Sequence, residues 1–398
     1  MKILSFGCRL NTFESKIIEG LLSDKDDLFV INTCAVTAEA ERQCRQTIRK
    51  TAREHPNMKI IVTGCAAQLN PEQYSKMPEV YKVVGNIEKL NRDKLLSDKK
   101  VEVSDIMKSE TSVPVVSDFE SRTRAFLQIQ QGCSHACTFC IVHTARGKNK
   151  GLLPDQVIDE AKRFVDKGFL ELVLTGVDIA SYPYGLNDLL KRILKEVKGL
   201  KRLRLGSFDP ALMTDEFISI MADNEIMMPH LHLSMQSGDD MILKRMGRRH
   251  LSGSVVEACQ KLIERRKDFV FGADMIAGFP TETEEMFFNT AEFIKNAPIS
   301  LLHVFPYSER PMTPAAKMPM VEMKIRKERA SYLRELGGRL LNLKLAEFEG
   351  KRLNVLIERN GVGYSENYLK VKTNSNKTGE IVSVLITKRN ENELVGQA

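Results

Sequence analysis

Strand-like and helix-like segments alternate through the first hundred residues, and this alternation constrains the fold more than any other feature. Apolar runs lie at Lys2–Phe6, Leu28–Ile31, Lys59–Val62 and Val80–Val84, and the segments between them read as helical. A βαβα order of this kind favours a parallel sheet with helices on both faces. The sequence therefore predicts an α/β fold for this part of the chain.

One cysteine follows each of the first three expected strands. Cys8 stands in SFGC, Cys34 in VINTC and Cys65 in IVTGC. Because open α/β sheets gather their ligands at the carboxyl edge of the strands, we expect these thiols to converge and to hold a metal cluster. The alternative is separate packing cysteines, since free cysteine is often buried as a small hydrophobe. Cys44 and Cys259, each in an expected helix, are interpreted as packing residues.

Three further cysteines lie close together in the run GCSHACTFC, namely Cys133, Cys137 and Cys140. Thiolates are soft ligands that suit iron–sulfur clusters or zinc. Structural zinc usually takes four ligands, and no fourth cysteine is near, although His135 and His143 flank the loop. A 4Fe-4S cluster on three cysteines leaves one iron open to a small molecule, so this loop favours such a cluster. A zinc site, a redox pair at Cys137 and Cys140, and packing cysteines are the alternatives.

The CxxxCxxC loop, with Phe139 before its last cysteine, resembles that of the radical-SAM superfamily, and two three-cysteine sets in this order resemble its methylthiotransferase family. The runs GCRLNTFES and NTCAVTAEAERQCRQTIRK are similar to the branch that acts on threonylcarbamoyladenosine in tRNA. This resemblance covers nearly the whole chain. It implies a transferase that uses two 4Fe-4S clusters, with S-adenosylmethionine (SAM) as radical source and methyl donor. The implied product is the 2-methylthio derivative of threonylcarbamoyladenosine beside the anticodon.

Two segments depart from the pattern of the family. After Cys140 the chain reads IVHTARGKNK where relatives carry IIPxxRGRxR, so His143 replaces a proline. The run RPMTPA stands where RxGTxA is usual. We expect neither change to abolish catalysis.

The sequence predicts three domains. Residues 1–105 form the methylthiotransferase N-terminal domain with the auxiliary cluster, and 102–124 is rich in Ser, Thr, Asp and Glu, as in a linker. Six strand-like runs alternate with helical stretches over 120–345, which suggests a partial (β/α)6 radical-SAM barrel. Short strands over 346–398 suggest a small all-β barrel that resembles the TRAM domain, an RNA-binding module.

The resemblance implies SAM contacts after the barrel strands, where such barrels place their working residues. The candidates are Phe139, Thr175, Gly176, Asp178, Ser207, Ser234, Gln236 and Asp274. A glycine or aspartate at such a position is also common as a turn residue or a helix cap, and this is the alternative for each of them.

The formal net charge of +7 points to a polyanionic partner, although a basic surface is common. Guanidinium groups suit phosphates and carboxylates, and aromatic side chains stack on unpaired bases. The candidate substrate contacts are Arg146, Arg245, Arg248, Arg310, Lys351, Arg352, Tyr364, Tyr368 and Lys370. The alternative for the C-terminal barrel is a module that only buttresses the main domain.

The chain shows no apolar run of membrane-spanning length and no signal-like start, so we expect a cytoplasmic protein without a membrane partner. Eight cysteines outside a secretory context favour metal thiolates over disulfides. The expected partners are the anticodon stem-loop of tRNA, a sulfur donor and a low-potential electron donor protein. Rival functions are the same chemistry on isopentenyladenosine in tRNA or on a ribosomal-protein aspartate, a different radical-SAM reaction, and a non-catalytic RNA-binding protein with structural metals.

Overall fold

The computed structural model describes residues 1–109 and 123–398, and the chain divides into two compact units. Unit 1 contains Met1–Phe119, Gln130–Leu152 and Ser308–Ala316, and unit 2 contains Glu120–Ile129, Leu153–Tyr307 and Lys317–Ala398. Of the predicted linker, residues 110–122 lie outside the described part of the chain. The three-domain boundaries given above stay a prediction.

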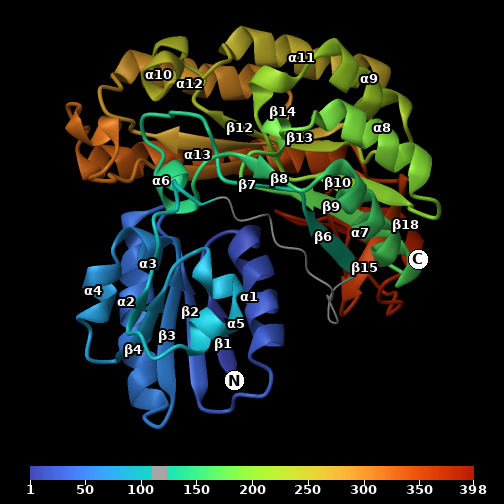
Figure 1. Cartoon of the computed structure of the whole chain (residues 1–398). Helices are drawn as coiled ribbons and strands as arrows, with labels where there is room; N and C mark the ends of the chain where they lie inside the picture. Colours follow the sequence, from blue (N-terminus) through green and yellow to red (C-terminus); the bar gives the residue numbers. More distant parts are fainter. Residues whose placement is uncertain (110–122) are drawn as a thin grey trace. The chain divides into compact units, whose positions relative to one another are not determined.

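Unit 1 is built on a parallel sheet of five strands that follow one another in chain order (Figure 1). The strands are β1 (Lys2–Ser5), β2 (Leu28–Thr33), β3 (Lys59–Gly64), β4 (Val80–Val84) and β5 (Val101–Glu102). The helices are α1 (Arg9–Leu21), α2 (Ala38–Glu54), α3 (Cys65–Leu69), α4 (Pro71–Ser75), η1 (Glu88–Leu90), α5 (Arg92–Leu96) and α6 (Val142–Arg146). A short antiparallel pair, β7 (Gln130–Gln131) and β8 (Lys150–Gly151), flanks α6.

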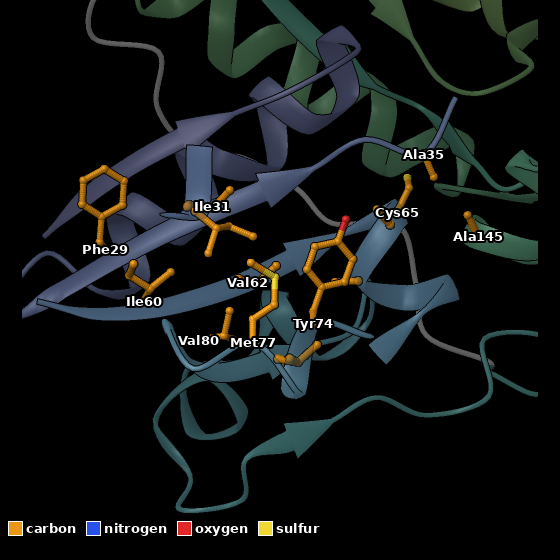
Figure 2. Close-up of a cluster of buried hydrophobic side chains, with 14 of the residues drawn as sticks. Phe29, Ile31, Ala35, Ile60, Val62, Cys65, Tyr74, Met77, Val80 and Ala145 are labelled. Atoms are coloured by element: carbon orange, nitrogen blue, oxygen red, sulfur yellow. The ribbon is translucent and has the colours of Figure 1, made fainter. Parts of the chain in front are cut away.

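The inner strands β2, β3 and β4 of this sheet are largely buried on both faces, as their continuous apolar runs predict. Successive side chains of a strand point to opposite faces. Phe29 and Ile31 of β2 therefore join a core that includes Tyr74 of α4 (Figure 2). Leu28 and Val30 join a second core, which contains side chains of α1 and α5. The predicted parallel sheet with helices on both faces is confirmed.

Unit 2 contains the predicted partial barrel, made of two parallel sheets in the orders β10-β9-β6 and β11-β12-β13-β14. Its strands are β6 (Arg124–Gln128), β9 (Glu171–Thr175), β10 (Arg202–Leu205), β11 (Ser207–Phe208), β12 (His230–Gln236), β13 (Val270–Ala277) and β14 (Ile299–Pro306). Its helices are α7 (Pro154–Asp166), η2 (Ile179–Ser181), α8 (Leu186–Glu196), η3 (Pro210–Leu212), α9 (Asp215–Asp223), α10 (Asp240–Met246), α11 (Ser252–Arg265), α12 (Glu284–Asn296) and α13 (Met323–Ala346). The short helix η4 (Pro314–Lys317) begins in the Ser308–Ala316 segment of unit 1.

The C-terminal part of unit 2 is a closed barrel of five strands in the order β15-β16-β17-β19-β18. The strands are β15 (Arg352–Arg359), β16 (Val362–Ser365), β17 (Lys370–Thr373), β18 (Ile381–Arg389) and β19 (Leu394–Gln397). Its core also contains Leu345 of α13 and Val270 of β13, so the small barrel packs on the larger one. The predicted all-β module is confirmed.

Within residues 1–109 and 123–398, none of the helices combines the length and the apolar character needed to cross a membrane.

Candidate functional site

The first cysteine set lies at the carboxyl edge of the sheet in unit 1, as predicted. Cys8 is the residue before α1, Cys34 follows β2 directly, and Cys65 opens α3 after β3. Cys34 and Cys65 are buried and Cys8 is exposed. Burial, and to a smaller extent the charges of Cys65 and Cys8, raise the pKa of Cys34 to about 12. A bound cation favours the thiolate form of a buried cysteine, so the position of Cys34 suits a metal cluster.

Two glycines allow the strand ends to approach one another at this edge. Gly7 has a φ of +88°, and a Cβ on it would lie 2.5 Å from Sγ of Cys34. Gly64 has a φ of +95°, and its Cβ would lie 2.3 Å from the carbonyl oxygen of Thr33. Only glycine adopts this backbone readily without a clash. The glycines in SFGC and IVTGC are therefore needed to bring Cys8 and Cys65 beside Cys34.

The second cysteine set lies in the segment between β7 and α6, which also belongs to unit 1. Cys133, Cys137 and Cys140 are all partly exposed. The backbone N–H of His135 donates to Sγ of Cys133, and that of Val142 donates to Sγ of Cys140, both at 3.4 Å. Amide donors aimed at sulfur are typical of iron–sulfur sites, where they tune the cluster. The donor set therefore fits a cluster held by three thiolates.

Both segments that depart from the family pattern contact this cysteine loop. Nδ1 of His143 lies within hydrogen-bond distance of the carbonyl oxygen of Cys133. The backbone N–H of Ala315, in the RPMTPA run, donates to the carbonyl oxygen of Thr138 at 2.9 Å. His143 and Ala315 thus brace the backbone of the loop. Ala315 is common to this chain and the family pattern, whereas Met312, which replaces the glycine of that pattern, is 58% exposed.

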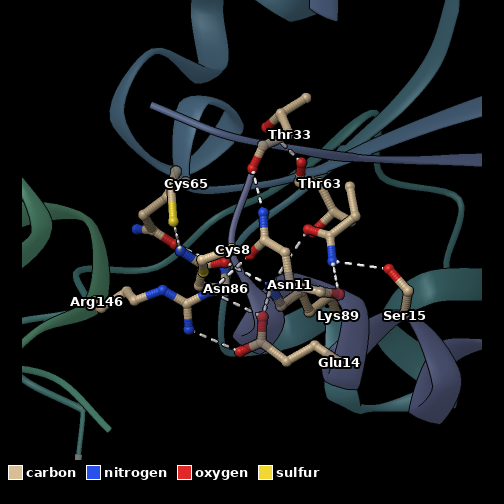
Figure 3. A network of polar contacts seen from close by, with 12 residues as sticks. Cys8, Asn11, Glu14, Ser15, Thr33, Thr63, Cys65, Asn86, Lys89 and Arg146 are labelled. Atoms are coloured by element: carbon tan, nitrogen blue, oxygen red, sulfur yellow. Dashed lines mark hydrogen bonds and ion pairs between the residues drawn. The ribbon is translucent and has the colours of Figure 1, made fainter. Parts of the chain in front are cut away.

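A buried charged network lies beside the first cysteine set (Figure 3). Arg146 donates through Nη1 and Nη2 to both carboxylate oxygens of Glu14 at 2.9 Å, and through Nη2 to Oδ1 of Asn11 at 2.6 Å. Nζ of Lys89 donates to Oε2 of Glu14 at 2.7 Å and to Oδ1 of Asn86 at 2.7 Å. The side chains of Glu14 and Lys89 are 0% exposed and that of Arg146 is 2% exposed. One carboxylate is thus shared by two buried cations.

The network adjoins the cysteines through Asn86, whose Nδ2 lies 3.8 Å from Sγ of Cys65. Burial by itself raises the pKa of Glu14, but Arg146 and Lys89 outweigh burial and lower that pKa to about 2. Burial lowers the pKa of Arg146, but the charges of Cys65 and Glu14 outweigh burial and raise it. Burial lowers the pKa of Lys89, whereas Arg146 keeps its positive charge near Cys65, where it complements the anionic thiolates that a cluster requires.

This placement corrects the expectation that Arg146 and Arg310 contact the substrate. The guanidinium of Arg146 is already bound to Glu14 and Asn11 in the interior of unit 1. Arg310 is 5% exposed and donates to Oε1 of Glu41 in the same unit. A phosphate could displace these carboxylates only by leaving them buried and unpaired, which is costly. Sequence reasoning missed Glu14 and Lys89, because neither stands in a motif that signals burial.

The predicted SAM residues in unit 2 lie at or near the carboxyl ends of barrel strands. Thr175 ends β9 and is followed by Gly176 and Asp178, and Ser207 opens β11 after β10. Ser234 and Gln236 lie on β12. Gln236 has a φ of +72°, which is rare for a residue other than glycine, and the register of β12 with β13 shifts beside it. Such outliers cluster at binding sites. Phe139 lies in the cysteine loop of unit 1. These SAM contacts stay a prediction.

Asp274 lies inside β13 instead of at its end, and it is engaged by two histidines. Its Oδ1 lies 2.9 Å from Nε2 of His232 and 3.4 Å from Nδ1 of His303. Burial by itself raises the pKa of Asp274, but these imidazoles outweigh burial and lower it to about 2. This bonding argues against the SAM contact predicted for Asp274. The two-residue period of HLHLSMQ was the signal that places His232 on the face of Ser234.

Arg248 and Arg245 also have partners inside unit 2. Nη2 of Arg248 donates to Oδ1 of Asp209 at 3.1 Å and to the carbonyl oxygen of Ser234 at 2.8 Å. Nη1 of Arg245 donates to Oγ1 of Thr281 at 2.8 Å. These bonds hold the loops after β11, β12 and β13, and this argues against the substrate contacts predicted for both arginines.

The predicted base-stacking residues of the small barrel face the large barrel instead. The rings of Tyr364 and Tyr368 stack with centroids 4.8 Å apart, and the ring of Tyr368 lies 4.7 Å from that of His230. Arg204 lies over Tyr368 and donates to the carbonyl oxygen of Ser365 at 2.6 Å. The aromatic pair therefore fastens the small barrel to the large one.

The predicted cations of the small barrel are more accessible. Lys351 and Arg352 are exposed, and Lys370, 46% exposed, pairs with Glu393 at 2.8 Å. These three side chains remain candidates for contact with a polyanion.

Known families and proteins resemble this chain over most of its length. A family model described as the Radical SAM superfamily matches residues 127–294, and one described as Uncharacterized protein family UPF0004 matches residues 1–85. Threonylcarbamoyladenosine tRNA methylthiotransferase MtaB from Rickettsia prowazekii is 50% identical over 93% of this chain and 90% of its own length. The protein of the same name from Aquifex aeolicus is 36% identical over 96% and 98%.

A tRNA-2-methylthio-N(6)-dimethylallyladenosine synthase from Bifidobacterium adolescentis is 33% identical over 96% of this chain and 85% of its own length. Among solved structures, the radical S-adenosylmethionine methyltransferase TsrM from Kitasatospora setae superposes with a TM-score of 0.57 at 14% identity, over 77% of this chain and 69% of that one, and so shares the fold. This chain shares half of its residues with the relative from Rickettsia prowazekii over nearly the whole length of both chains, and it has two sets of three cysteines. These findings show that the chain belongs to the radical-SAM methylthiotransferase family, in its threonylcarbamoyladenosine tRNA methylthiotransferase branch.

Proposed function

We propose that this protein converts threonylcarbamoyladenosine beside the anticodon of a tRNA into its 2-methylthio derivative. The observation that carries this proposal is the 50% identity, over 93% of the chain, to a relative with that name. The relative named for dimethylallyladenosine is 33% identical, so the sister branch is less well supported.

The family uses SAM and 4Fe-4S clusters, and we assign one cluster to Cys133, Cys137 and Cys140 and the other to Cys8, Cys34 and Cys65. When bound, these groups supply the radical and sulfur chemistry that an inert aryl C–H bond requires. The protein's own residues orient and shield them. Backbone amides of His135 and Val142 donate to the loop sulfurs, and Asn86 lies beside Cys65.

The charged network places fixed, buried charges beside the auxiliary site. Glu14, Lys89 and Arg146 are buried and bonded to one another, so their charges do not reorient when the site changes its charge. Arg146 comes six residues after Cys140, and Glu14 comes six residues after Cys8. Their ion pair therefore joins the chain segment of one cysteine set to that of the other.

Contact with tRNA requires cations that are exposed. Lys351, Arg352 and Lys370 on the small barrel meet this condition, and we assign them to the phosphate backbone of the anticodon stem-loop. A sulfur donor and a low-potential electron donor complete the reaction, and the cytoplasm, where tRNA is modified, is the proposed location.

Mass spectrometry of nucleosides tests this function. The reconstituted protein, SAM and a strong reductant are incubated with anticodon stem-loops that carry threonylcarbamoyladenosine, isopentenyladenosine or unmodified adenosine. We expect a methylthio product from the first substrate only. A methylthio product from the isopentenyl substrate alone would assign the protein to the sister branch. If the protein contained no iron, bound RNA and did not cleave SAM, it would be a binding protein and not an enzyme.

A further inference from the structure

The face of β12, β13 and β14 that points away from the helices carries a polar cluster. Leu302 of β14 packs against α13, since a Cβ on Gly337 of that helix would lie 3.0 Å from Cβ of Leu302. His303 therefore points to the opposite face. It is the register partner of Asp274 on β13, and His232 is the partner of Gly272. A Cβ on Gly272 would lie 2.5 Å from Nδ1 of His232, so this glycine makes room for the imidazole.

One carboxylate orients both imidazoles of this cluster. Oδ1 of Asp274 accepts from Nε2 of His232 at 2.9 Å and pairs with Nδ1 of His303 at 3.4 Å. The two imidazole centroids are 4.6 Å apart. Since Asp274 engages Nδ1 of His303, Nε2 is left as the outer atom of that ring. The side chain of His303 is 63% exposed, whereas that of His232 is 15% exposed. His303 is thus the member of the cluster that can reach a ligand.

An exposed aromatic side chain lies beside His303 on the same face. Phe305 is two residues further along β14, which puts it about 7 Å away on that face. It is 47% exposed, although it lies in a strand whose other face is packed against helices. A phenyl ring in such a position can stack on a base. His303 and Phe305 together offer one flat apolar surface and one oriented hydrogen-bonding group.

This pair matches the chemistry of a hypermodified adenosine. The arginines first considered for the threonyl group, Arg146, Arg245 and Arg248, are bonded elsewhere. We propose that Phe305 stacks on the adenine and that Nε2 of His303 hydrogen-bonds to its threonylcarbamoyl group. Asp274 and His232 then position His303. This inference rests on the proposed function and deepens it, because it names the residues that read the substituent on the base.

The cluster would also disfavour the apolar isopentenyl group. A site built to hydrogen-bond a substrate discriminates strongly against an analogue without the polar group, because its own polar atoms are then left unpaired. An isopentenyl chain would cover the polar side chains of His303, Asp274 and His232 without offering them a hydrogen-bond partner. Replacing His303 by an apolar residue should therefore narrow the preference between the two substrates.

Steady-state kinetics on the reconstituted enzyme test this inference with three variants and one control variant. His303→Leu should raise KM for the threonylcarbamoyl stem-loop by about tenfold or more and should lower the preference over the isopentenyl stem-loop. His303→Gln, which retains a hydrogen-bonding group, should recover part of the loss. Phe305→Leu should raise KM for both stem-loops, whereas Phe288→Leu, at an aromatic residue of α12 that is 57% exposed, should leave KM unchanged.

Asp274→Asn separates positioning from a merely structural role. Because Asp274 acts through His303, the Asp274→Asn substitution should lower the preference for the threonylcarbamoyl over the isopentenyl stem-loop in the parent enzyme. The same substitution should have little further effect in the His303→Leu variant. The iron content should stay at the parent level in every variant. An unchanged KM and preference in His303→Leu, or equal effects of Phe305→Leu and Phe288→Leu, would overturn the inference. A parent enzyme that gives no product from the threonylcarbamoyl substrate would instead overturn the proposed function.

Discussion

Replacing Glu14 by glutamine tests the buried network beside the auxiliary cysteines. Glu14 of α1 is the only carboxylate hydrogen-bonded to Arg146 and Lys89 within residues 1–109 and 123–398, and the three side chains are nearly inaccessible to water. The variant keeps the size of the side chain but removes its charge. Two buried cations would then lie beside each other without compensation.

Two independent arguments give the size of the effect. Removing one partner of a buried ion pair costs about 3–5 kcal/mol. The pKa of Glu14 is lowered from 4.5 to about 2, and a shift of that size corresponds to about 3 kcal/mol of stability at neutral pH. We therefore expect Glu14→Gln to destabilise unit 1 by about 3 kcal/mol.

Hydrogen exchange followed by mass spectrometry measures this effect in each unit separately. Peptides from α1 and β2 should exchange about a hundredfold faster in Glu14→Gln than in the parent protein, while peptides from β13 in unit 2 should not change. Glu19→Gln on the same helix is the matched control, because Glu19 pairs with Lys16 at the surface and such pairs contribute about 0–1 kcal/mol. Equal protection in the two variants would refute the reasoning.

Three further predictions concern the pH dependence of unit 1, the glycine beside Cys34 and the exposed cations of the small barrel. The share of stability due to Glu14 is complete above pH 4.5 and is lost as pH falls toward 2, so the acid unfolding of unit 1, followed by circular dichroism, should have a shallower pH dependence in Glu14→Gln. Gly7→Ala would place a Cβ 2.5 Å from Sγ of Cys34, so the iron content of the reconstituted variant should fall toward that of one cluster per chain. An iron content equal to that of the parent protein would contradict the need for glycine at this position. Replacing Lys351 and Arg352 together by alanine should weaken the binding of every tRNA sequence and reduce the slope of log binding constant against log salt concentration by about 2. An unchanged slope in binding titrations would exclude both residues from the phosphate contact.

The cysteine sets were predictable because their convergence follows from a general rule of topology. Parallel strands present their carboxyl ends at one edge, so Cys8, Cys34 and Cys65 could be placed together from strand assignments alone. The C-terminal barrel was equally predictable, because the sequence of this region shows short strands separated by turns.

The partners of charged and aromatic residues were not predictable in this way. Arg146 and Glu14 are 132 residues apart in the chain. Because arginine is rarely fully buried unless it is paired, Arg146 is interpreted from the sequence as an exposed contact for the substrate. Tyr368 reads as a base-stacking residue until the structure shows it against His230. The cluster of His232, Asp274 and His303 depends on the register between three strands, which the periodicity of each strand does not determine.

The central claim is that six cysteines form two separate cluster sites with different roles. Its most direct test is the iron and sulfide content of the reconstituted protein, compared with a variant in which Cys8, Cys34 and Cys65 are all replaced by alanine. We expect two 4Fe-4S clusters in the parent protein, and one in the variant, which should still cleave SAM but form no methylthio nucleoside. A parent protein with a single cluster, or a variant that still forms the product, would contradict this account.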